Sequence, residues 1–372
     1  MNPLEKLHNF GQSPWMDYIR RDLFASGELK SLISNDGISG VTSNPSIFEK
    51  AIAQSDEYQD AIAAFAGRGD LNAKDIFESL EVSDIQNTAD ALRSVYDATS
   101  RRDGYVSMEV SPRLGHDVEG TLAEARRLWA MVDRPNLLVK VPATDEGIPI
   151  IKQLLSEGIN VNVTLLFSQE AYKNVAQAFI SGLEARLENG GDISGVASVA
   201  SLFVSRIDTL VDRLIDEKLE SIEDVDQAAL LKGIKGKVAI ANSRICYQDY
   251  KNLFSGERWQ VLADKGANTQ RLLWASTSTK DPAYSDTLYV DQLIGPDTVN
   301  TIPPATMDAF RDHGNPQNSL ENDIETAYKI FDILKDADIS MTKVTDQLLE
   351  EGLEQFVVAF DNLLNVVDKA RS

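Results

Sequence analysis

The chain has 372 residues, of which 43% are hydrophobic, and this is enough to bury a sizeable core. Its formal net charge of −22 disfavours general binding to nucleic acid or to an anionic membrane surface, and no stretch approaches the roughly 18 consecutive apolar residues of a membrane span. The single cysteine, Cys246, excludes an intramolecular disulfide, and the three histidines lack zinc-site spacing. We therefore expect a reduced, cytoplasmic protein without a metal ion.

Short apolar segments alternate with longer segments of helical period along most of the chain. The predicted strands, in chain order, are residues 15–19, 38–44, 105–110, 136–143, 159–167, 195–204, 271–277 and 298–302. Several are apolar at both alternating positions, as expected when helices cover one face of a sheet and a packed interior lies on the other. Eight such strands separated by helices predict an α/β fold, the parallel (β/α)8 or TIM barrel.

From Ser319 onward the pattern is wholly helical. Apolar residues at i, i+3 and i+4 spacing form a stripe on this tail, namely Leu348, Leu349, Leu353, Phe356, Val357, Phe360, Leu363 and Leu364. The stripe is too short to demand a dimerising coiled coil, so it favours a terminal helix packed on the barrel, and it permits a homodimer without requiring one. We expect residues 1–372 to form one barrel domain with additional helices, of which residues 319–372 are an extension.

The predicted strand 136–143, NLLVKVPA, places a lysine among apolar, mostly branched residues. Strand alternation puts Leu138, Lys140 and Pro142 on one face, which points into the barrel if the other face meets the helices. Burial disfavours an ammonium ion, and a neutral amine there can attack a carbonyl group to form a Schiff base. On this strand alone, a structural lysine, held by a salt bridge inside the barrel or extending from a strand end to solvent, is the slightly favoured interpretation.

Two other predicted strands carry polar side chains among apolar ones. Glu109, in strand 105–110, can exchange protons with Lys140 or with a water molecule, or can form a buried ion pair. In strand 159–167, Asn160, Asn162 and Thr164 alternate on one face, a ladder suited to sugar hydroxyls or to orienting a water molecule. Three polar groups on one strand face favour a cavity lining over a dry core.

Further polar residues follow the predicted strands. Asn44 either forms an Asx-turn before Pro45 or holds a substrate oxygen. Ser201 and Arg206 follow a strand of small residues, and the guanidinium group suits a phosphate, with a surface salt bridge as the alternative. Lys280 lies in a Ser/Thr-rich loop where it can complete an anion site, although a solvated lysine is the simpler interpretation.

Five segments together resemble the transaldolase family in sequence and order: TSNPS, SMEVSPRL, LLVKVPAT, NVNVTLLFS and SLFVSRID. The similarity runs from WMD near the start to TVNTIPPAT near residue 306, and the long helical tail matches the longer members. It implies a class I aldolase barrel without metal or organic cofactor. It also implies reversible transfer of a dihydroxyacetone unit between sugar phosphates, from sedoheptulose 7-phosphate to glyceraldehyde 3-phosphate, in the non-oxidative pentose phosphate pathway.

The resemblance also implies roles for residues in the matching motifs. Lys140 would be the Schiff-base lysine, and Glu109 the acid/base that works through a water molecule positioned by Thr164. Asp17 would accept the proton of the substrate C4 hydroxyl as the C3–C4 bond breaks. The implied substrate-binding residues are Asn44, Asn162 and Ser201 for hydroxyl groups and Arg206 for the phosphate. Lys280 stands where some members carry a second arginine, so its assignment departs from the family pattern.

Three alternatives remain beside this interpretation. The nearest is a lyase on the same scaffold that cleaves fructose 6-phosphate without transfer. Phe203 favours the transferase, because lyase-like relatives tend to carry a tyrosine there. A pyridoxal phosphate enzyme also uses a lysine imine, but the sequence shows no glycine-rich phosphate cradle paired with a carboxylate for the pyridine nitrogen. A sugar-phosphate-binding barrel without turnover is the non-enzymatic alternative, which the combination of lysine, acid and base disfavours.

Overall fold

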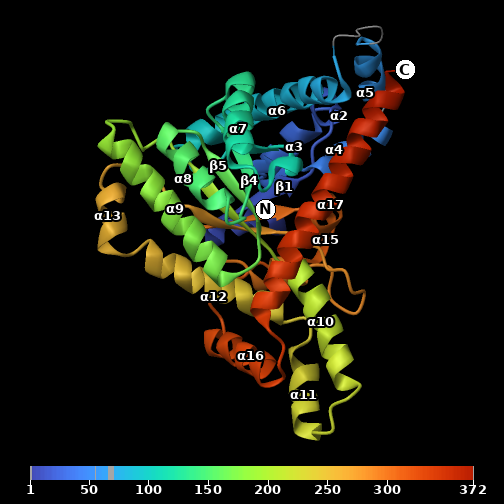
Figure 1. Ribbon diagram of the computed structural model, residues 1–372, viewed down its shortest axis with the longest axis vertical. Coiled ribbons are helices and arrows are strands. Elements are labelled where there is room, and N and C mark those ends of the chain that lie inside the picture. Colours follow the sequence, from blue (N-terminus) through green and yellow to red (C-terminus); the bar gives the residue numbers. More distant parts are fainter. Residues whose placement is uncertain (1, 55, 66–70, 372) are drawn as a thin grey trace.

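Eight parallel strands form a closed barrel in the computed structural model, which describes residues 2–54, 56–65 and 71–371 (Figure 1). The strands follow one another around the ring in chain order, and β8 pairs with β1 to close it. Their bounds are β1 Gln12–Asp17, β2 Gly40–Thr42, β3 Tyr105–Glu109, β4 Leu137–Pro142, β5 Val161–Leu166, β6 Ser198–Phe203, β7 Arg271–Ala275 and β8 Thr298–Ile302. The predicted (β/α)8 barrel is confirmed.

Helices connect the strands and surround the barrel. In the first half of the chain they are α1 Pro3–Lys6, α2 Asp22–Ala25, α3 Glu28–Asp36, α4 Pro45–Gln54, α5 Asp56–Ala63, α6 Ala73–Ala98, α7 Val118–Val132, α8 Gly147–Glu157 and α9 Gln169–Glu188, with 3-10 helices η1 Leu7–Phe10 and η2 Pro112–Leu114. In the second half they are α10 Ser205–Leu219, α11 Val225–Ile234, α12 Val238–Leu253, α13 Glu257–Ala263, α14 Leu288–Gln292, α15 Pro304–His313, α16 Ile324–Asp336 and α17 Met341–Ala370. None of the helices in the described ranges has the length and apolar character that a membrane span requires.

Every predicted strand segment overlaps one observed strand, but the ends differ. The first strand begins at Gln12 rather than at residue 15, and Pro14 lies inside it opposite Asn300 of β8. A Gly-Gln-Ser-Pro stretch is typical of a turn, which explains the late predicted start. β2 is only three residues long. A Cβ atom on its first residue, Gly40, would lie 2.4 Å from the Trp15 ring, so only glycine fits at this position.

Strands β4 and β5 are buried on both faces, one toward the barrel interior and the other toward the surrounding helices. All residues of β4 and β5 are buried, in agreement with the predicted apolar character at both alternations. At the amino-terminal end of the barrel, the Arg271 guanidinium forms an ion pair with Asp103 at 2.9 Å and donates a hydrogen bond to the Ser13 hydroxyl at 2.7 Å. The Trp15 indole donates to the same Asp103 carboxylate at 3.0 Å. This buried network closes one end, so the other end is the open one.

Helix α17 crosses the open end of the barrel and packs on α4, α6, α10 and β5 (Figure 1). The predicted stripe faces the protein: Leu348, Leu353, Phe356, Phe360 and Leu363 are buried, and Leu349, Val357 and Leu364 are half-buried. Gly352 allows close approach, since a Cβ atom there would lie 2.9 Å from Leu165 Cδ2 and 3.5 Å from Arg206 Nη1. The terminal helix is therefore packed on the barrel, as predicted.

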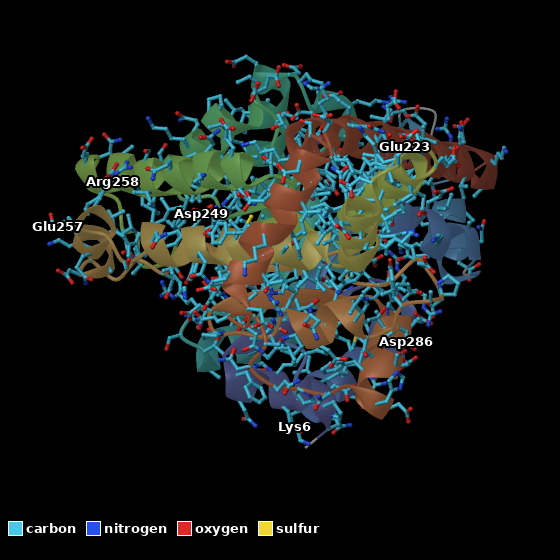
Figure 2. The ribbon with its side chains drawn as sticks, turned by 90° about the horizontal axis from the view of Figure 1, so that it is seen from below. Lys6, Glu223, Asp249, Glu257, Arg258 and Asp286 are labelled. Carbon is cyan, nitrogen blue, oxygen red and sulfur yellow. The ribbon has the colours of Figure 1, made fainter. Side chains whose placement is uncertain are left out.

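Charged side chains project from the periphery of the molecule. Figure 2 shows Lys6, Glu223, Glu257 and Asp286 pointing outward from helices and loops that surround the barrel, and all four are exposed. The acidic excess of the chain is thus partly displayed at its surface, where water screens it.

Candidate active site

A lysine and a carboxylate lie side by side within the barrel. The strand register pairs Glu109 with Lys140 and Lys140 with Asn162, so adjacent strands bring these three residues to one level. Lys140 Nζ donates hydrogen bonds to Glu109 Oε2 at 3.1 Å and to the Ser43 carbonyl at 2.9 Å. Lys140 is 5% exposed, and its side chain points into the barrel. Lys140 is buried, as a Schiff-base lysine would be, and it is also paired with a carboxylate, as a structural lysine would be. The geometry is therefore compatible with both interpretations of the isolated strand.

A second carboxylate lies close to the pair. Asp17, the last residue of β1, accepts a hydrogen bond from the Thr42 hydroxyl at 2.7 Å, and that hydroxyl is also 2.6 Å from the Thr301 hydroxyl. Burial raises the pKa of Asp17, against the Thr42 hydrogen bond and the positive charge of Lys140. Burial likewise raises the pKa of Glu109, although Lys140 opposes this. Two carboxyl groups that accept protons readily therefore flank one amine.

Neutral polar groups line the next two strands. Ser201 donates to Asn162 Oδ1 at 2.6 Å, and Asn162 Nδ2 donates to the Ser107 hydroxyl at 2.9 Å, which fixes the orientation of the carboxamide. Thr164 Oγ1 is buried and makes no hydrogen bond to a described atom. A buried hydroxyl without a partner is unusual, and a water molecule or a substrate oxygen would satisfy it.

Asn44 follows β2 and performs the local role that its sequence predicts. Its Oδ1 accepts a hydrogen bond from the Ile47 amide at 3.0 Å, which caps the first turn of α4. The Nδ2 group makes no hydrogen bond to a described residue, so it remains available as a donor. The Asx-turn and the binding interpretation are therefore compatible.

Three cations gather beyond the carboxyl ends of the strands. Arg206, in the first turn of α10, lies over the Phe203 ring with its Cζ 5.4 Å from the centroid. Burial lowers the pKa of Arg206, and burial together with the charges of Arg206 and Lys50 lowers that of Lys280. Lys280 Nζ donates to the Ser278 hydroxyl at 2.8 Å. Within the described ranges none of the three forms an ion pair with a carboxylate, an arrangement that favours an anionic ligand.

Several contributors escaped the sequence interpretation. Ser107 could have been found, because strand alternation places it on the same face as Glu109. Lys50 lies on α4, directly after the TSNPS segment, and its charge acts on Lys280. Phe356 of α17 has its ring centroid 5.9 Å from Lys140 Nζ. The sequence marked Phe356 as part of an apolar stripe but gave no indication that the stripe crosses the barrel.

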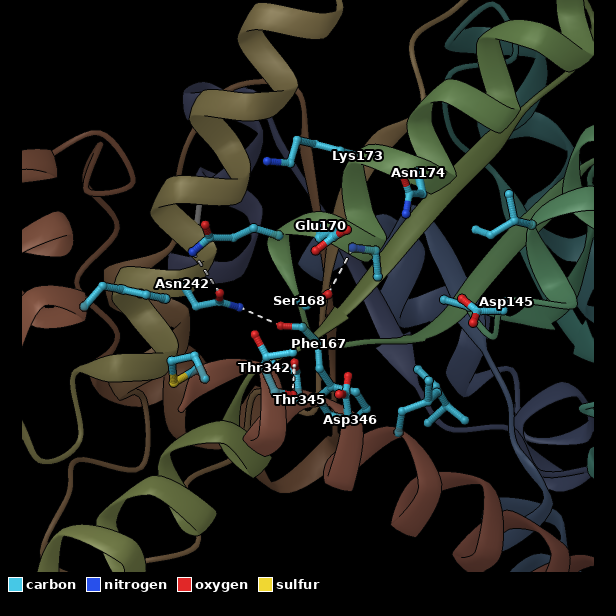
Figure 3. A pocket seen from close by; sticks show the side chains of 18 residues that line it. Asp145, Phe167, Ser168, Glu170, Lys173, Asn174, Asn242, Thr342, Thr345 and Asp346 are labelled. Atoms are coloured by element: carbon cyan, nitrogen blue, oxygen red, sulfur yellow. Dashed lines mark hydrogen bonds between the residues drawn. The ribbon is translucent and has the colours of Figure 1, made fainter. Parts of the chain in front are cut away.

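A pocket near the Lys140–Glu109 pair is lined by residues other than the predicted site residues. Figure 3 shows Phe167, Ser168 and Asn242 facing Thr342 and Asp346 of α17 across a pocket of about 480 Å³. None of the predicted site residues lines it. The groups capable of amine and proton chemistry are therefore inside the barrel, beneath α17. Among residues 2–54, 56–65 and 71–371, no group of three or more His, Cys, Asp or Glu side chains is arranged to hold a metal ion.

A parallel eight-stranded barrel with a buried lysine–carboxylate pair and nearby unpaired cations defines a class, the barrel enzymes of the Schiff-base aldolase type. Residues 14–367 match the family model described as Transaldolase/Fructose-6-phosphate aldolase, and the chain belongs to this family. It is 51% identical over 370 residues to Transaldolase 2 of Nostoc punctiforme, covering 99% of this chain and 97% of that protein.

Two further relatives show the same extent of similarity. The transaldolase of Trichodesmium erythraeum is 50% identical over 370 residues, which cover 99% of this chain and 97% of the relative. The transaldolase of Thermobifida fusca is 46% identical over 367 residues, which cover 98% and 97%. The match therefore includes α17 and is not confined to the barrel.

Proposed function

We propose that this protein is a transaldolase, which reversibly transfers a dihydroxyacetone unit from sedoheptulose 7-phosphate to glyceraldehyde 3-phosphate and releases erythrose 4-phosphate and fructose 6-phosphate. The observation that carries the proposal is the buried Lys140–Glu109 pair, at 3.1 Å, beside a cluster of unpaired cations. The names of the relatives support the same activity. We further propose that residues 1–372 act as one catalytic barrel domain, with residues 319–372 as its helical extension, in the cytoplasm.

Glu109 and Thr164 serve the formation of the Schiff base. Lys140 gives a proton to Glu109, whose pKa burial has raised, and the neutral amine attacks the C2 carbonyl of the ketose. The carbinolamine then loses its hydroxyl as water when Glu109 returns a proton through a water molecule held by the free hydroxyl of Thr164. The product is an iminium ion at Lys140, which withdraws electrons from the neighbouring C3–C4 bond.

Asp17 serves the carbon–carbon cleavage. Its raised pKa suits a base that takes the proton of the C4 hydroxyl as the C3–C4 bond breaks. The bonding electrons move into the iminium and give an enamine, while the aldose phosphate leaves. An acceptor aldehyde then reacts by the same steps in reverse, with Asp17 returning its proton to the new hydroxyl.

The remaining predicted residues hold the substrate. The fixed Asn162 carboxamide, the Ser201 hydroxyl and the Nδ2 group of Asn44 are neutral partners for the hydroxyls of the dihydroxyacetone unit. Neutral partners orient the substrate without opposing the positive charge that develops at Lys140. Arg206 and Lys280 bind the terminal phosphate, whose negative charge relieves their mutual repulsion.

The lyase alternative is disfavoured by the surroundings of Phe203. Its ring packs against Phe167 at 5.4 Å between centroids and under Arg206, so an apolar group stands where a hydroxyl would be needed to activate water for release of the bound unit. Retention of the enamine until an acceptor arrives is the behaviour of a transferase. A barrel that only binds sugar phosphates would make no use of the Lys140–Glu109 pair.

Borohydride trapping tests the proposal. The protein is reduced in the presence of fructose 6-phosphate, and the modified peptide is identified by mass mapping; we expect the adduct on Lys140. Lys140→Ala should abolish both adduct and turnover, whereas Lys152→Ala, at an exposed lysine of α8, should change neither. A Lys140→Ala variant that retains activity would refute the assignment. Fructose 6-phosphate with erythrose 4-phosphate, compared with fructose 6-phosphate alone, separates transfer from cleavage.

A further inference from the structure

An aromatic side chain of the terminal helix covers the reactive nitrogen. The ring of Phe356, on α17, presents its face to Lys140, with its centroid 5.9 Å from Nζ. Both residues are buried, each being 5% exposed. The groups that form and cleave bonds in the proposed mechanism lie on strands, whereas Phe356 lies on a helix that follows the whole barrel in the chain. The mechanism therefore leaves Phe356 without a role.

Contacts one turn before and one turn after Phe356 hold its ring in place. On one side, Gly352 brings α17 close to the barrel, since a Cβ atom there would lie 2.9 Å from Leu165 Cδ2. On the other side, the Phe360 ring meets Phe77 of α6 edge to face, with centroids 6.1 Å apart. Because α17 is packed on both sides of Phe356, moving this ring away from the lysine would break one of these contacts.

Phe360 is also held by the loop that follows β3. The Arg113 guanidinium, in η2, lies 5.8 Å from the Phe360 ring centroid, and its Nε donates to Asp361 Oδ1 at 3.0 Å. Phe360 and Glu109 line one cavity of about 20 Å³, which is room for about one water molecule. The two aromatic rings of α17 thus lie against the two members of the Lys140–Glu109 pair, and the space for water beside Glu109 is small.

The Phe356 ring suits both charge states of the nitrogen that it covers. The iminium ion at Lys140 is positive, and the negative face of an aromatic ring attracts a cation at this distance. The enamine nitrogen that follows carbon–carbon cleavage is neutral, and the ring is an apolar cover for it. No step of the proposed reaction therefore favours displacement of the ring.

We propose that Phe356 is a specificity-determining residue, which keeps water from the enamine so that the dihydroxyacetone unit is retained for an acceptor aldehyde; this rests on the proposed transaldolase function. C3 of the enamine is two bonds from the nitrogen that Phe356 covers, so the ring restricts the approach of water to it. Phe356 forms no bond and moves no proton.

The reaction that Phe356 suppresses is release of the bound unit. A water molecule gives a proton to C3, the enamine electrons form the new C3–H bond, and an iminium and a hydroxide ion result. The hydroxide adds to C2 and gives a carbinolamine. Its hydroxyl proton then passes to the nitrogen as the C2–N bond breaks, so that dihydroxyacetone leaves and the Lys140 amine is restored. One water molecule is consumed, which balances the one lost when the Schiff base formed.

The site admits water at one position and excludes it at others. The buried Thr164 hydroxyl makes no hydrogen bond to a described atom, and it suits the one water molecule that Schiff-base formation requires. Phe203 of β6 and Phe356 of α17 instead supply apolar surface, from two distant parts of the chain. The terminal helix therefore contributes to the choice between transfer and release, in addition to covering the barrel.

Two substitutions at Phe356 and two controls test the proposal. Phe356→Leu leaves a smaller apolar cover, and Phe356→Ala removes the cover. Val358→Ala changes a side chain of the same helix that is 59% exposed. Phe179→Leu changes a buried aromatic residue of α9 that packs on Phe254 and Trp259 rather than on site residues.

Four quantities would be measured for each variant. They are the melting temperature, borohydride-trapped adduct on Lys140, the rate of transfer from fructose 6-phosphate to erythrose 4-phosphate, and the rate of dihydroxyacetone release from fructose 6-phosphate alone. The ratio of release to transfer tests the role of Phe356. Because both reactions pass through the same enamine, a general loss of stability or activity leaves this ratio unchanged.

We expect the ratio of release to transfer to rise about threefold in Phe356→Leu and about tenfold or more in Phe356→Ala, with the Lys140 adduct still formed, because water reaches the enamine. Both controls should keep the wild-type ratio, although Phe179→Leu should lower the melting temperature. A wild-type ratio in folded Phe356→Ala would overturn the proposal. If that variant does not fold, a wild-type ratio in Phe356→Leu would overturn it, as would an equal rise in Phe179→Leu. Absence of a Lys140 adduct in the wild type would instead refute the proposed function.

Discussion

Asp208, a buried carboxyl group on α10, makes the stability of the fold depend on pH. It is 1% exposed, and it accepts hydrogen bonds from the Ala239 amide at 2.7 Å and the Tyr289 hydroxyl at 2.9 Å. Burial is the main reason that its pKa rises from 3.8 to about 7, against the Ala239 hydrogen bond. The folded protein therefore binds this proton more tightly than the unfolded chain does.

The sign and size of the effect follow from this difference. Between pH 4 and 7 the folded state holds more protons at this site than the unfolded state. The stabilisation that the Asp208 proton gives the folded state is therefore complete below about pH 4 and is lost as pH rises through about 7. A pKa difference of about 3 corresponds to about 4 kcal/mol of unfolding free energy in total. Of this, about 2–3 kcal/mol falls between pH 5 and pH 8.

Asp208→Asn isolates the contribution, because the amide keeps the shape, accepts from Ala239 with Oδ1 and donates to Tyr289 with Nδ2. Relative to the wild type, the variant should gain about 2–3 kcal/mol of unfolding free energy as pH rises from 5 to 8. Urea unfolding at each pH measures it, with the exposed Asp216→Asn on the same helix as control. A gain within about 0.5 kcal/mol, the usual scatter of surface substitutions, would refute the reasoning.

Three further predictions concern binding and packing. Arg206→Ala should raise KM for phosphorylated donors about 10- to 100-fold with less effect on kcat, because charge-assisted hydrogen bonds contribute about 1.5–3 kcal/mol. A KM of the variant equal to that of the wild type in steady-state kinetics would contradict this. Gly352→Leu should destabilise by about 1–3 kcal/mol through overpacking against Leu165, and Gly352→Ala by less, as melting temperatures would show. Asp103→Ala should cost about 3–5 kcal/mol by leaving Arg271 buried and unpaired, whereas the exposed Asp97→Ala should not.

The sequence was sufficient for the barrel because strand periodicity is a local property. Eight apolar segments separated by helical ones identified the fold, and alternation within NLLVKVPA was enough to turn Lys140 inward. The predicted start of β1 was wrong because Pro14 and its neighbours have the composition of a turn. Only their pairing with β8 makes them part of a strand. Local composition cannot report a partner so distant along the chain.

The site was only partly predictable for a related reason. Candidates on the strands, such as Glu109, Asn162 and Ser201, could be predicted to lie together because each strand contributes its end to one opening, and the structure places them side by side. Phe356 was not predicted, because it lies on a helix whose sequence indicates an apolar stripe but not what that stripe covers. How α6 and α17 dock on the barrel depends on the three-dimensional packing of many side chains, which periodicity does not encode.

The closure of the barrel by β1 and β8 has a consequence for folding. In the finished ring every strand has two neighbours, so no row of backbone amides and carbonyls is open to another molecule. A chain that has assembled β1 to β7 but has not yet added β8 presents two such edges. The pairing that removes them joins residues as distant as Gln12 and Thr298, 286 positions apart, and contacts of that separation form slowly. Aggregation therefore threatens this protein chiefly while it folds, in the interval before its first and last strands meet.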